Sequence, residues 1–211
     1  MEIVTTPSSW PAVLVGLLIG AYWLRVLQMV LHTKRTAGRA ANLIPPEHLG
    51  RLLRIIWIPV VGLWIAIPLA LPFVRGLPLP LRPLTYTGCD VVGWVAVAVT
   101  GTAFAITWIC WIRMGTSWRM GIDPNERTTL VVDGPFAVVR HPIYGLSQVM
   151  MVATLAAWPS PLMLLVAALH VFFMQWEVRR EDRYLAALHG SAYADYIQQT
   201  GRFIPRLARW K

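Results

Sequence analysis

Two short clusters of polar residues in the C-terminal half of the chain have the composition of a ligand site. The first is Arg140-His141, followed by Pro142 and Tyr144, and the second is the acidic pair Glu181-Asp182, about forty residues later. A guanidinium holds a carboxylate in a fixed pose, and a histidine or carboxylate acts as a general base toward an amine or a thiol. Together these groups suit a polar, charged organic ligand and the orientation of a second reactant beside it.

Each cluster has a plainer interpretation when it is taken alone. Arg140-His141-Pro142 is typical of a helix start, with the proline in the first turn and the arginine at the lipid headgroups. Glu181-Asp182 is typical of a solvated helix face that pairs with a neighbour such as Arg179 or Arg183. The order and spacing of the clusters, rather than either motif, favour a shared site.

The elements that must position these clusters are predicted to be membrane helices. Of the 211 residues, 56% are hydrophobic and 14% are charged, whereas about 25% of the residues of a soluble domain are charged. Three segments have the roughly 20 residues that a membrane-spanning helix needs: Pro11–His32, Leu52–Val74 and Asp90–Ile112. Two shorter segments, Ile143–Trp158 and Pro161–Trp176, are predicted to form a tight helical hairpin.

This hairpin predicts that the two polar clusters are neighbours. Arg140-His141 precedes the first leg, and Glu181-Asp182 lies about one helical turn beyond the second, so antiparallel legs return both clusters to one membrane face. The chain therefore divides into residues 1–113, a scaffold of three helices, and residues 114–211, a catalytic region with a loop, the hairpin and further helices.

The catalytic region has recognisable local signals outside the hairpin. Turn residues such as Asp123-Pro124-Asn125 indicate a loop before Arg140, which contains a short β-prone run, Thr129–Val132. After the hairpin, Glu177–His189 is predicted to be a charged helix that continues past the membrane and stops at Gly190. A second short helix, Ala192–Gln199, is predicted to follow.

The net charge of +9 is interpreted as an orientation signal. Lysines and arginines alternate between the loops, with five at 34–54, two at 75–89, four at 113–140 and seven from 179 onward. With five spans, this pattern predicts an external N-terminus and a cytosolic C-terminus, in the inner membrane if the cell is bacterial. The basic residues then contact anionic membrane lipids, and no nucleic-acid partner is expected.

The cysteines and histidines give no sign of a disulfide or a metal site. Cys89 and Cys110 bracket the third span, and a continuous helix would separate them by about 30 Å. His32, His48 and His189 lack metal-ligand spacing, so no metal is predicted. His170, within the last span, is predicted to be a hydrogen-bonded core residue.

The order of several short motifs carries a family resemblance. In sequence, they are Leu130-Val131, Gly134-Pro135-Phe136, Arg140-His141-Pro142-Ile143-Tyr144, Glu181-Asp182, Leu185, Gly190, Tyr193, Tyr196 and Arg202-Phe203-Ile204-Pro205. From Met114 to Arg206, the chain resembles the C-terminal half of the isoprenylcysteine carboxyl methyltransferase and phospholipid methyltransferase family. These are membrane enzymes that use S-adenosylmethionine.

The resemblance implies an all-α, polytopic membrane methyltransferase with about five spans and a cytosolic cofactor pocket. It also implies roles for individual residues. Cofactor contacts are expected from His141, Pro142, Tyr144, Glu181, Asp182 and Gly134, and catalytic roles from Arg140 and Glu181. The acceptor is expected to be a lipid-like small molecule that enters from the bilayer.

The favoured reaction is O-methylation of an isoprenoid-type carboxylate, with Arg140 holding the carboxylate. The rivals are methylation of a phospholipid amine or a small thiol, where His141 or Glu181 would be the base. Two more distant rivals are a sterol-type reductase that uses NADPH and a lipid-binding protein without catalysis. The sequence departs from the family in having Glu-Asp instead of Glu-Glu, and Glu177 where eukaryotic members have an acceptor-side arginine. Whether Glu177, Arg179 or Arg180 takes that place stays open at this point.

Overall fold

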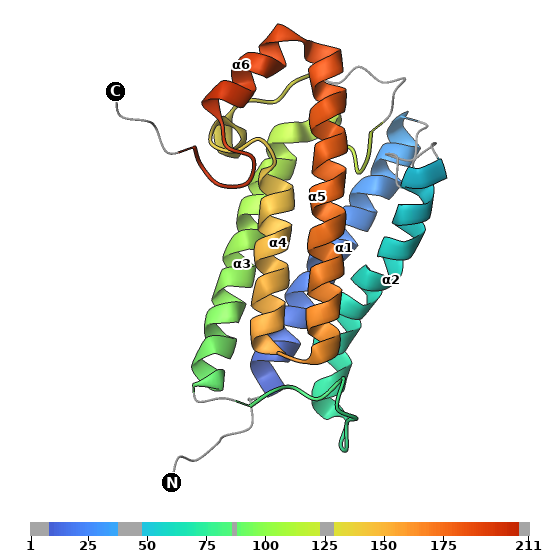
Figure 1. Cartoon of the computed structure of the whole chain (residues 1–211), viewed down its shortest axis with the longest axis vertical. Helices are drawn as coiled ribbons and strands as arrows, with labels where there is room; N and C mark the ends of the chain where they lie inside the picture. Colours follow the sequence, from blue (N-terminus) through green and yellow to red (C-terminus); the bar gives the residue numbers. More distant parts are fainter. Residues whose placement is uncertain (1–8, 38–47, 86–87, 123–128, 207–211) are drawn as a thin grey trace.

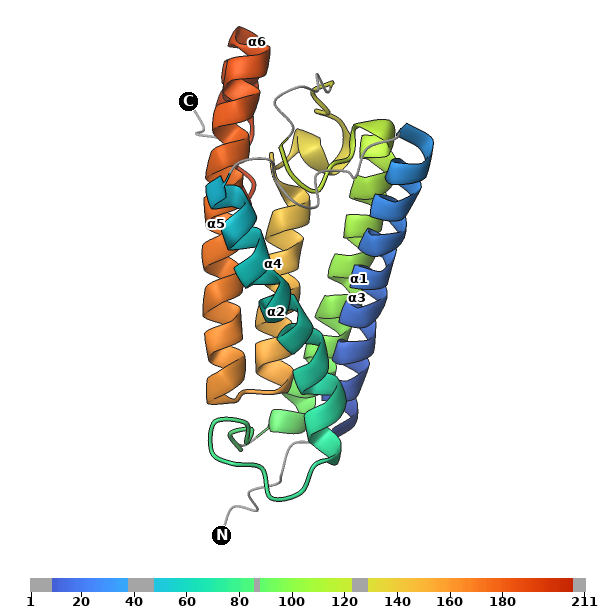
Figure 2. The ribbon, with the colours of Figure 1, turned by 90° about the vertical axis from the view of Figure 1, so that its right-hand side faces the viewer.

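The protein is a bundle of helices in the computed structural model, which describes residues 9–37, 48–85, 88–122 and 129–206. These residues contain no β-strand and six α-helices: α1 (Ser9–Ala37), α2 (His48–Ala70), α3 (Cys89–Met114), α4 (Pro142–Ala157), α5 (Pro161–His189) and α6 (Ser191–Gln199). Helices α1 to α5 run side by side, and α6 lies beyond the end of α5 (Figures 1 and 2). The predicted all-α class is confirmed.

The predicted membrane spans agree with the helices, with longer bounds. In the part of the chain that the structure describes, four helices are long and apolar enough to cross a membrane: Trp10–Arg35, His48–Phe73, Cys89–Met114 and Pro161–His189. The fifth predicted span is α4, an apolar helix of 16 residues. Large apolar side chains face outward on all five helices, where lipid would cover them: Leu17, Leu24, Ile55, Ile58, Val95, Ile109, Val152, Leu164 and Phe172.

The predicted hairpin is formed by α4 and α5, and two hydrogen bonds fix its turn. Ser160 precedes α5, and its side chain accepts a hydrogen bond from the Met163 N–H, 3.2 Å away. The indole Nε1 of Trp158 donates to the Leu81 carbonyl over 3.2 Å. The loop after α2 therefore closes this end of the bundle, opposite the end that carries α6 (Figure 1).

The second leg of the hairpin continues past the predicted span, as expected. Helix α5 has no break after Trp176, so the last predicted span and the charged helix after it are one helix of 29 residues. It stops at Gly190, whose φ of 54° favours glycine, as predicted. The predicted short helix is α6.

The β-prone run Thr129–Val132 is irregular and belongs to the segment before α4, where a loop was predicted. The turn residues Asp123-Pro124-Asn125 lie outside the described residues.

The bundle core contains satisfied polar groups among its apolar side chains. Ser147 Oγ and His170 Nε2 are 3.0 Å apart, which confirms the prediction of a hydrogen-bonded core histidine. The indole of Trp64 donates to the Thr154 hydroxyl over 2.8 Å. These contacts join α4 to α5 and to α2 in the core of the bundle.

Candidate functional site

The start of α4 is fixed by the segment that follows α6. Val139 and Gly201 form an isolated parallel bridge. The Arg140 N–H donates to the Gly201 carbonyl over 2.8 Å, and the His141 N–H donates to the Arg202 carbonyl over 3.1 Å. A Cβ at Gly201 would lie 1.7 Å from the Ile204 carbonyl oxygen, so the close turn requires glycine here. The first motif is therefore held in place by a segment that follows it by about 60 residues in the sequence.

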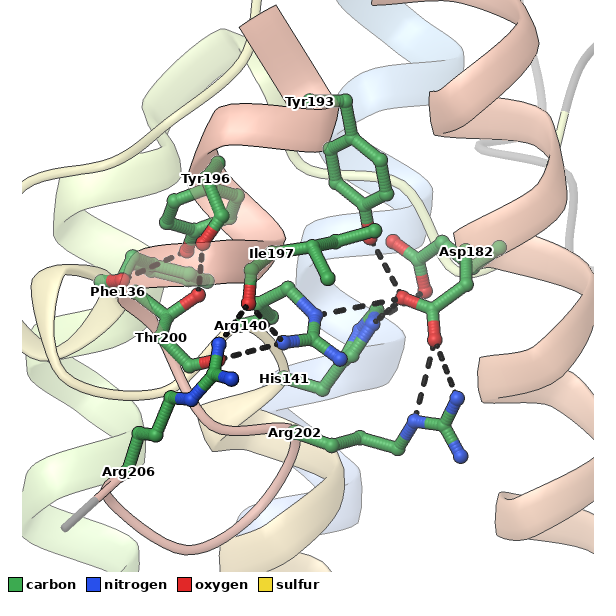
Figure 3. A network of polar contacts seen from close by, with 11 residues as sticks. Phe136, Arg140, His141, Asp182, Tyr193, Tyr196, Ile197, Thr200, Arg202 and Arg206 are labelled. Atoms are coloured by element: carbon green, nitrogen blue, oxygen red, sulfur yellow. Dashed lines mark hydrogen bonds and ion pairs between the residues drawn. The ribbon is translucent and has the colours of Figure 1, made fainter. Parts of the chain in front are cut away.

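Asp182 is the centre of a polar cluster at this end of the bundle, which we call the Asp182 network (Figure 3). Its Oδ1 lies 2.7 Å from His141 Nε2 and accepts a hydrogen bond of 2.6 Å from the Tyr193 hydroxyl. Its Oδ2 lies 2.9 Å from Arg202 Nη2 and 3.1 Å from Arg202 Nε. The side chain of Asp182 is only 13% exposed. The network thus joins the starts of α4 and α6 to the end of α5, and it confirms that the hairpin brings the two predicted clusters together.

Arg140 points from the same place toward the C-terminal end of α6 (Figure 3). Its Nη1 donates to the carbonyls of Thr200, at 2.7 Å, and Ile197, at 3.5 Å. The last carbonyls of a helix have no partner within the helix, so a guanidinium stabilises them well. The Nε of Arg140 is 3.7 Å from Asp182 Oδ1 and has no hydrogen bond within the described residues.

Two tyrosines of α6 complete the frame of the site. Burial and the hydrogen bond to Asp182 raise the pKa of the Tyr193 phenol well above its usual range. Burial likewise raises the pKa of Tyr196 to about 12. The Tyr196 hydroxyl donates to the Phe136 carbonyl over 2.6 Å. Both phenols therefore remain protonated donors at physiological pH. Tyr193 holds α6 against α5, and Tyr196 holds α6 against the segment before α4.

Two cavities meet beside this frame. We call the first the aromatic cavity, because nine aromatic side chains line it: Tyr22, Trp23, Trp57, Trp111, Trp118, Phe136, Tyr144, Phe173 and Trp176. It contains about 950 Å³ of space between atoms, its open mouth included. The second, the loop-side cavity, contains about 830 Å³ and lies between residues 114–122 and 129–131 on one side and helices α5 and α6 on the other. Arg140, Tyr144, Glu177 and Glu181 line both cavities and so form their boundary.

The predicted site residues occupy different positions relative to this boundary. His141 and Pro142 line the aromatic cavity, next to the boundary residues Tyr144 and Glu181. Glu181 Oε2 is 3.9 Å from His141 Nδ1, and its side chain is 28% exposed, so it is the more accessible carboxylate of the acidic pair. Asp182 lines neither cavity and acts on the site through His141.

Gly134 also lines neither cavity. It begins a short helical turn, Gly134–Ala137, with a φ of 58°. A Cβ there would lie 3.4 Å from Arg113 Nε. The structure therefore gives Gly134 a place in shaping the turn, and its predicted contact with the cofactor stays a prediction.

The sequence interpretation missed one charged residue of the aromatic cavity. Arg54 comes from α2, is 8% exposed, and is paired with Glu177 of α5, with Nη2 3.4 Å from Oε1. Arg54 is counted with the basic residues at 34–54 in the sequence, although it lies inside the predicted span Leu52–Val74. A charged residue within a membrane helix is itself a signal of function.

The part of the chain that matches known proteins includes the two polar clusters of this site. Residues 91–192 match the model of the family described as phospholipid methyltransferase. The cobalt-zinc-cadmium resistance protein CzcN of Cupriavidus metallidurans is 29% identical over 101 residues, which are 46% of this chain and 46% of that protein. The nickel-cobalt-cadmium resistance protein NccN of Alcaligenes xylosoxydans xylosoxydans is 27% identical over 119 residues, which are 56% of this chain and 55% of that protein. The similarity thus spans about half the length of these two relatives.

Proposed function

We propose that this chain, which belongs through residues 91–192 to the phospholipid methyltransferase family, transfers a methyl group from S-adenosylmethionine to a lipophilic acceptor. The family implies a methyltransferase, and the apolar helices imply an integral membrane protein. The observation that carries the finer proposal is the meeting of two cavities at Arg140, Tyr144 and Glu181. One cavity suits a polar cofactor from water, and the other suits an apolar acceptor from the bilayer.

The chemistry of the donor set fits S-adenosylmethionine. This molecule carries an ammonium, a carboxylate, ribose hydroxyls, an adenine edge and a sulfonium. The partly exposed Glu181 carboxylate suits the ammonium or hydroxyls, and the buried Arg140 Nε has no acceptor within the described residues. Aromatic faces such as Tyr144 attract a cationic centre. We propose that Glu181 and Tyr144 hold the cofactor where the cavities meet, that His141 contacts it from the aromatic-cavity side, and that Asp182 fixes the His141 ring.

S-adenosylmethionine supplies an electrophilic methyl group: as the acceptor forms its new bond to the methyl carbon, the carbon–sulfur bond breaks and its electrons remain on sulfur. The chain's contribution is orientation and the exclusion of water. The buried indole rings of Trp57, Trp111 and Trp118 line the aromatic cavity and limit its water content. A carboxylate acceptor is already ionised at neutral pH, so no general base is needed. The products would be a neutral methyl ester and a neutral thioether.

We propose an isoprenoid-type carboxylate as the acceptor. The aromatic cavity supports a long apolar chain, and buried guanidinium groups beside it support an anionic head. A phospholipid amine or a small thiol remains the alternative, with His141 or Glu181 as the base. The names of the two relatives describe resistance to cobalt, zinc, cadmium and nickel, and they do not name a methyl acceptor.

We further propose that the site faces the cytosol, because lysines and arginines are concentrated in the loops at that end of the bundle. Single cysteines introduced into the described residues 115–122 and 129–139 should react with an impermeant thiol reagent only after the cytosolic side is exposed. Labelling of intact cells at these cysteines would overturn both the orientation and the route of the cofactor.

Cofactor binding can be tested by calorimetry on the full chain in detergent. The protein should bind S-adenosylmethionine and its demethylated product more tightly than NADPH. His141→Ala and Glu181→Ala should each weaken binding by about 1 to 3 kcal/mol, since each removes a polar contact in a partly buried site.

Asp133→Ala is the matched control, because Asp133 is an exposed acidic residue outside both cavities. It should bind like the wild type. Preference for NADPH would support the reductase instead, and wild-type affinity in both site variants would remove His141 and Glu181 from the cofactor site.

A further inference from the structure

The least expected charged group in the aromatic cavity is the guanidinium of Arg54. It lies over the ring of Trp57, with 5.1 Å between its Cζ atom and the ring centroid. Its Nη2 donates to the Met120 carbonyl over 3.1 Å and to Glu177 Oε1 over 3.4 Å. Within the described residues, Nη1 has no hydrogen-bond acceptor. Arg54 is therefore fixed on one side and retains donors on the other.

Glu177 is held more closely by another arginine. Its Oε2 accepts a hydrogen bond of 2.8 Å from Arg180 Nη1, against the 3.4 Å contact between its Oε1 and Arg54. In this cluster of Arg54, Glu177 and Arg180, two guanidinium groups share one carboxylate. The guanidinium of Arg54 lines a cavity with aromatic walls, where a low dielectric strengthens its attraction for an anion.

The neighbouring wall offers further donors. The indole Nε1 atoms of Trp23 and Trp57 are buried and have no acceptor within the described residues. The two rings pack edge to face, with centroids 5.2 Å apart, and both residues line the aromatic cavity. An excess of donors and of positive charge suits a ligand head group that has oxygen acceptors and a negative charge, and disfavours an ammonium.

We propose that Arg54 receives and orients the carboxylate of the acceptor, and that Glu177 is the carboxylate it holds until the acceptor arrives. The proposal rests on the methyltransferase function above, and it names the substrate class of that site. Binding exchanges one carboxylate for another at Arg54, while Glu177 keeps its shorter contact with Arg180. Arg54 of α2 thus takes the role first expected for Arg140. The Nη1 of Arg140 is already bound to two backbone carbonyls.

Two variants with opposite expected effects test this exchange. A prenyl-chain carboxylic acid is titrated into the full chain in detergent, and its Kd is measured from tryptophan fluorescence. Arg54→Lys keeps the charge and loses the planar two-point grip, so the Kd of the acid should rise about tenfold or more. Glu177→Gln removes the competing charge, so the Kd should fall about threefold. The affinity for S-adenosylmethionine should stay within about twofold in Arg54→Lys, since Arg54 lines the aromatic cavity and not the loop-side cavity.

Arg25→Lys is the matched control, since Arg25 lies over Trp108, 4.8 Å from the ring centroid, and does not line the aromatic cavity. It should bind both ligands like the wild type. A prenyl amine with the same chain should bind more weakly than the acid in the wild type, and Arg54→Lys should not weaken it further.

The outcomes separate this inference from the function on which it rests. If Arg54→Lys binds the acid normally, or if Glu177→Gln weakens acid binding as much as Arg54→Lys does, the exchange is wrong and the pair is only structural. Should Arg54→Lys fail to fold, tighter binding in Glu177→Gln supports the exchange and weaker binding overturns it. A wild-type protein that does not bind S-adenosylmethionine would contradict the methyltransferase function itself.

Discussion

Asp182, which is mostly shielded from solvent, and Glu177, which is buried, are carboxylates of α5 less than two helical turns apart, yet their surroundings differ. Asp182 is saturated: His141, Tyr193 and Arg202 all contact it within 3.1 Å. Glu177 has one close contact, with Arg180, and one longer contact of 3.4 Å, with Arg54. The first carboxylate belongs to a closed network, and the second to a cluster that still has donors to offer.

The difference indicates what each carboxylate does. A buried charge with all its partners in place holds elements together and is costly to disturb. A buried guanidinium with an incomplete set of acceptors is suited to a ligand that completes the set. We therefore interpret the Asp182 network as the frame of the site and the Arg54–Glu177–Arg180 cluster as its acceptor side. The frame fixes His141, and the acceptor side selects what is methylated.

The largest expected effect comes from breaking the frame. Asp182→Ala leaves the buried His141 and Tyr193 groups and the partly exposed Arg202 without their shared partner, so the free energy of unfolding should fall by about 3 kcal/mol. Binding of S-adenosylmethionine should weaken as well, because the His141 ring loses the contact that orients it. Denaturant unfolding in detergent and calorimetry measure the two effects.

The smallest expected effect comes from an ion pair at the same end of the bundle. Arg113 Nη1 lies 3.0 Å from Asp133 Oδ2, but these side chains are 53% and 59% exposed. Water and salt screen such a pair, so Asp133→Ala should change the free energy of unfolding by less than about 1 kcal/mol. Equal losses in Asp133→Ala and Asp182→Ala would mean that the network is no more than a surface feature.

The central pair of the frame was predictable from sequence, since His141 and Asp182 lie on the two legs of a hairpin. Two apolar segments of similar length with a Pro-Ser-Pro turn leave little choice of pairing, and the pairing brings His141 to Asp182. The partners of Arg140 were not predictable. Its guanidinium lies at the open carbonyls of α6, and only the turn at Gly201 brings that helix end back to α4.

Arg54 was missed for a different physical reason. It lies 123 residues from Glu177 in sequence and meets it only because α2 packs on α5. No local pattern encodes that contact, and at the edge of an apolar segment an arginine also suits a headgroup anchor. The β-prone run Thr129–Val132 forms no strand, because β-prone residues form a strand only where a partner strand is available.

The central claim is that a lipid carboxylate is methylated beside Arg54, and labelled methyl transfer tests it most directly. The full chain in lipid vesicles would be given radiolabelled S-adenosylmethionine and, in parallel, a prenyl-chain carboxylic acid, the matched amine or the matched thiol. We expect label in the acid as a base-labile methyl ester, with Arg54→Lys at least about tenfold less active. Transfer to the amine or thiol alone, with Arg54→Lys as active as the wild type, would contradict the claim.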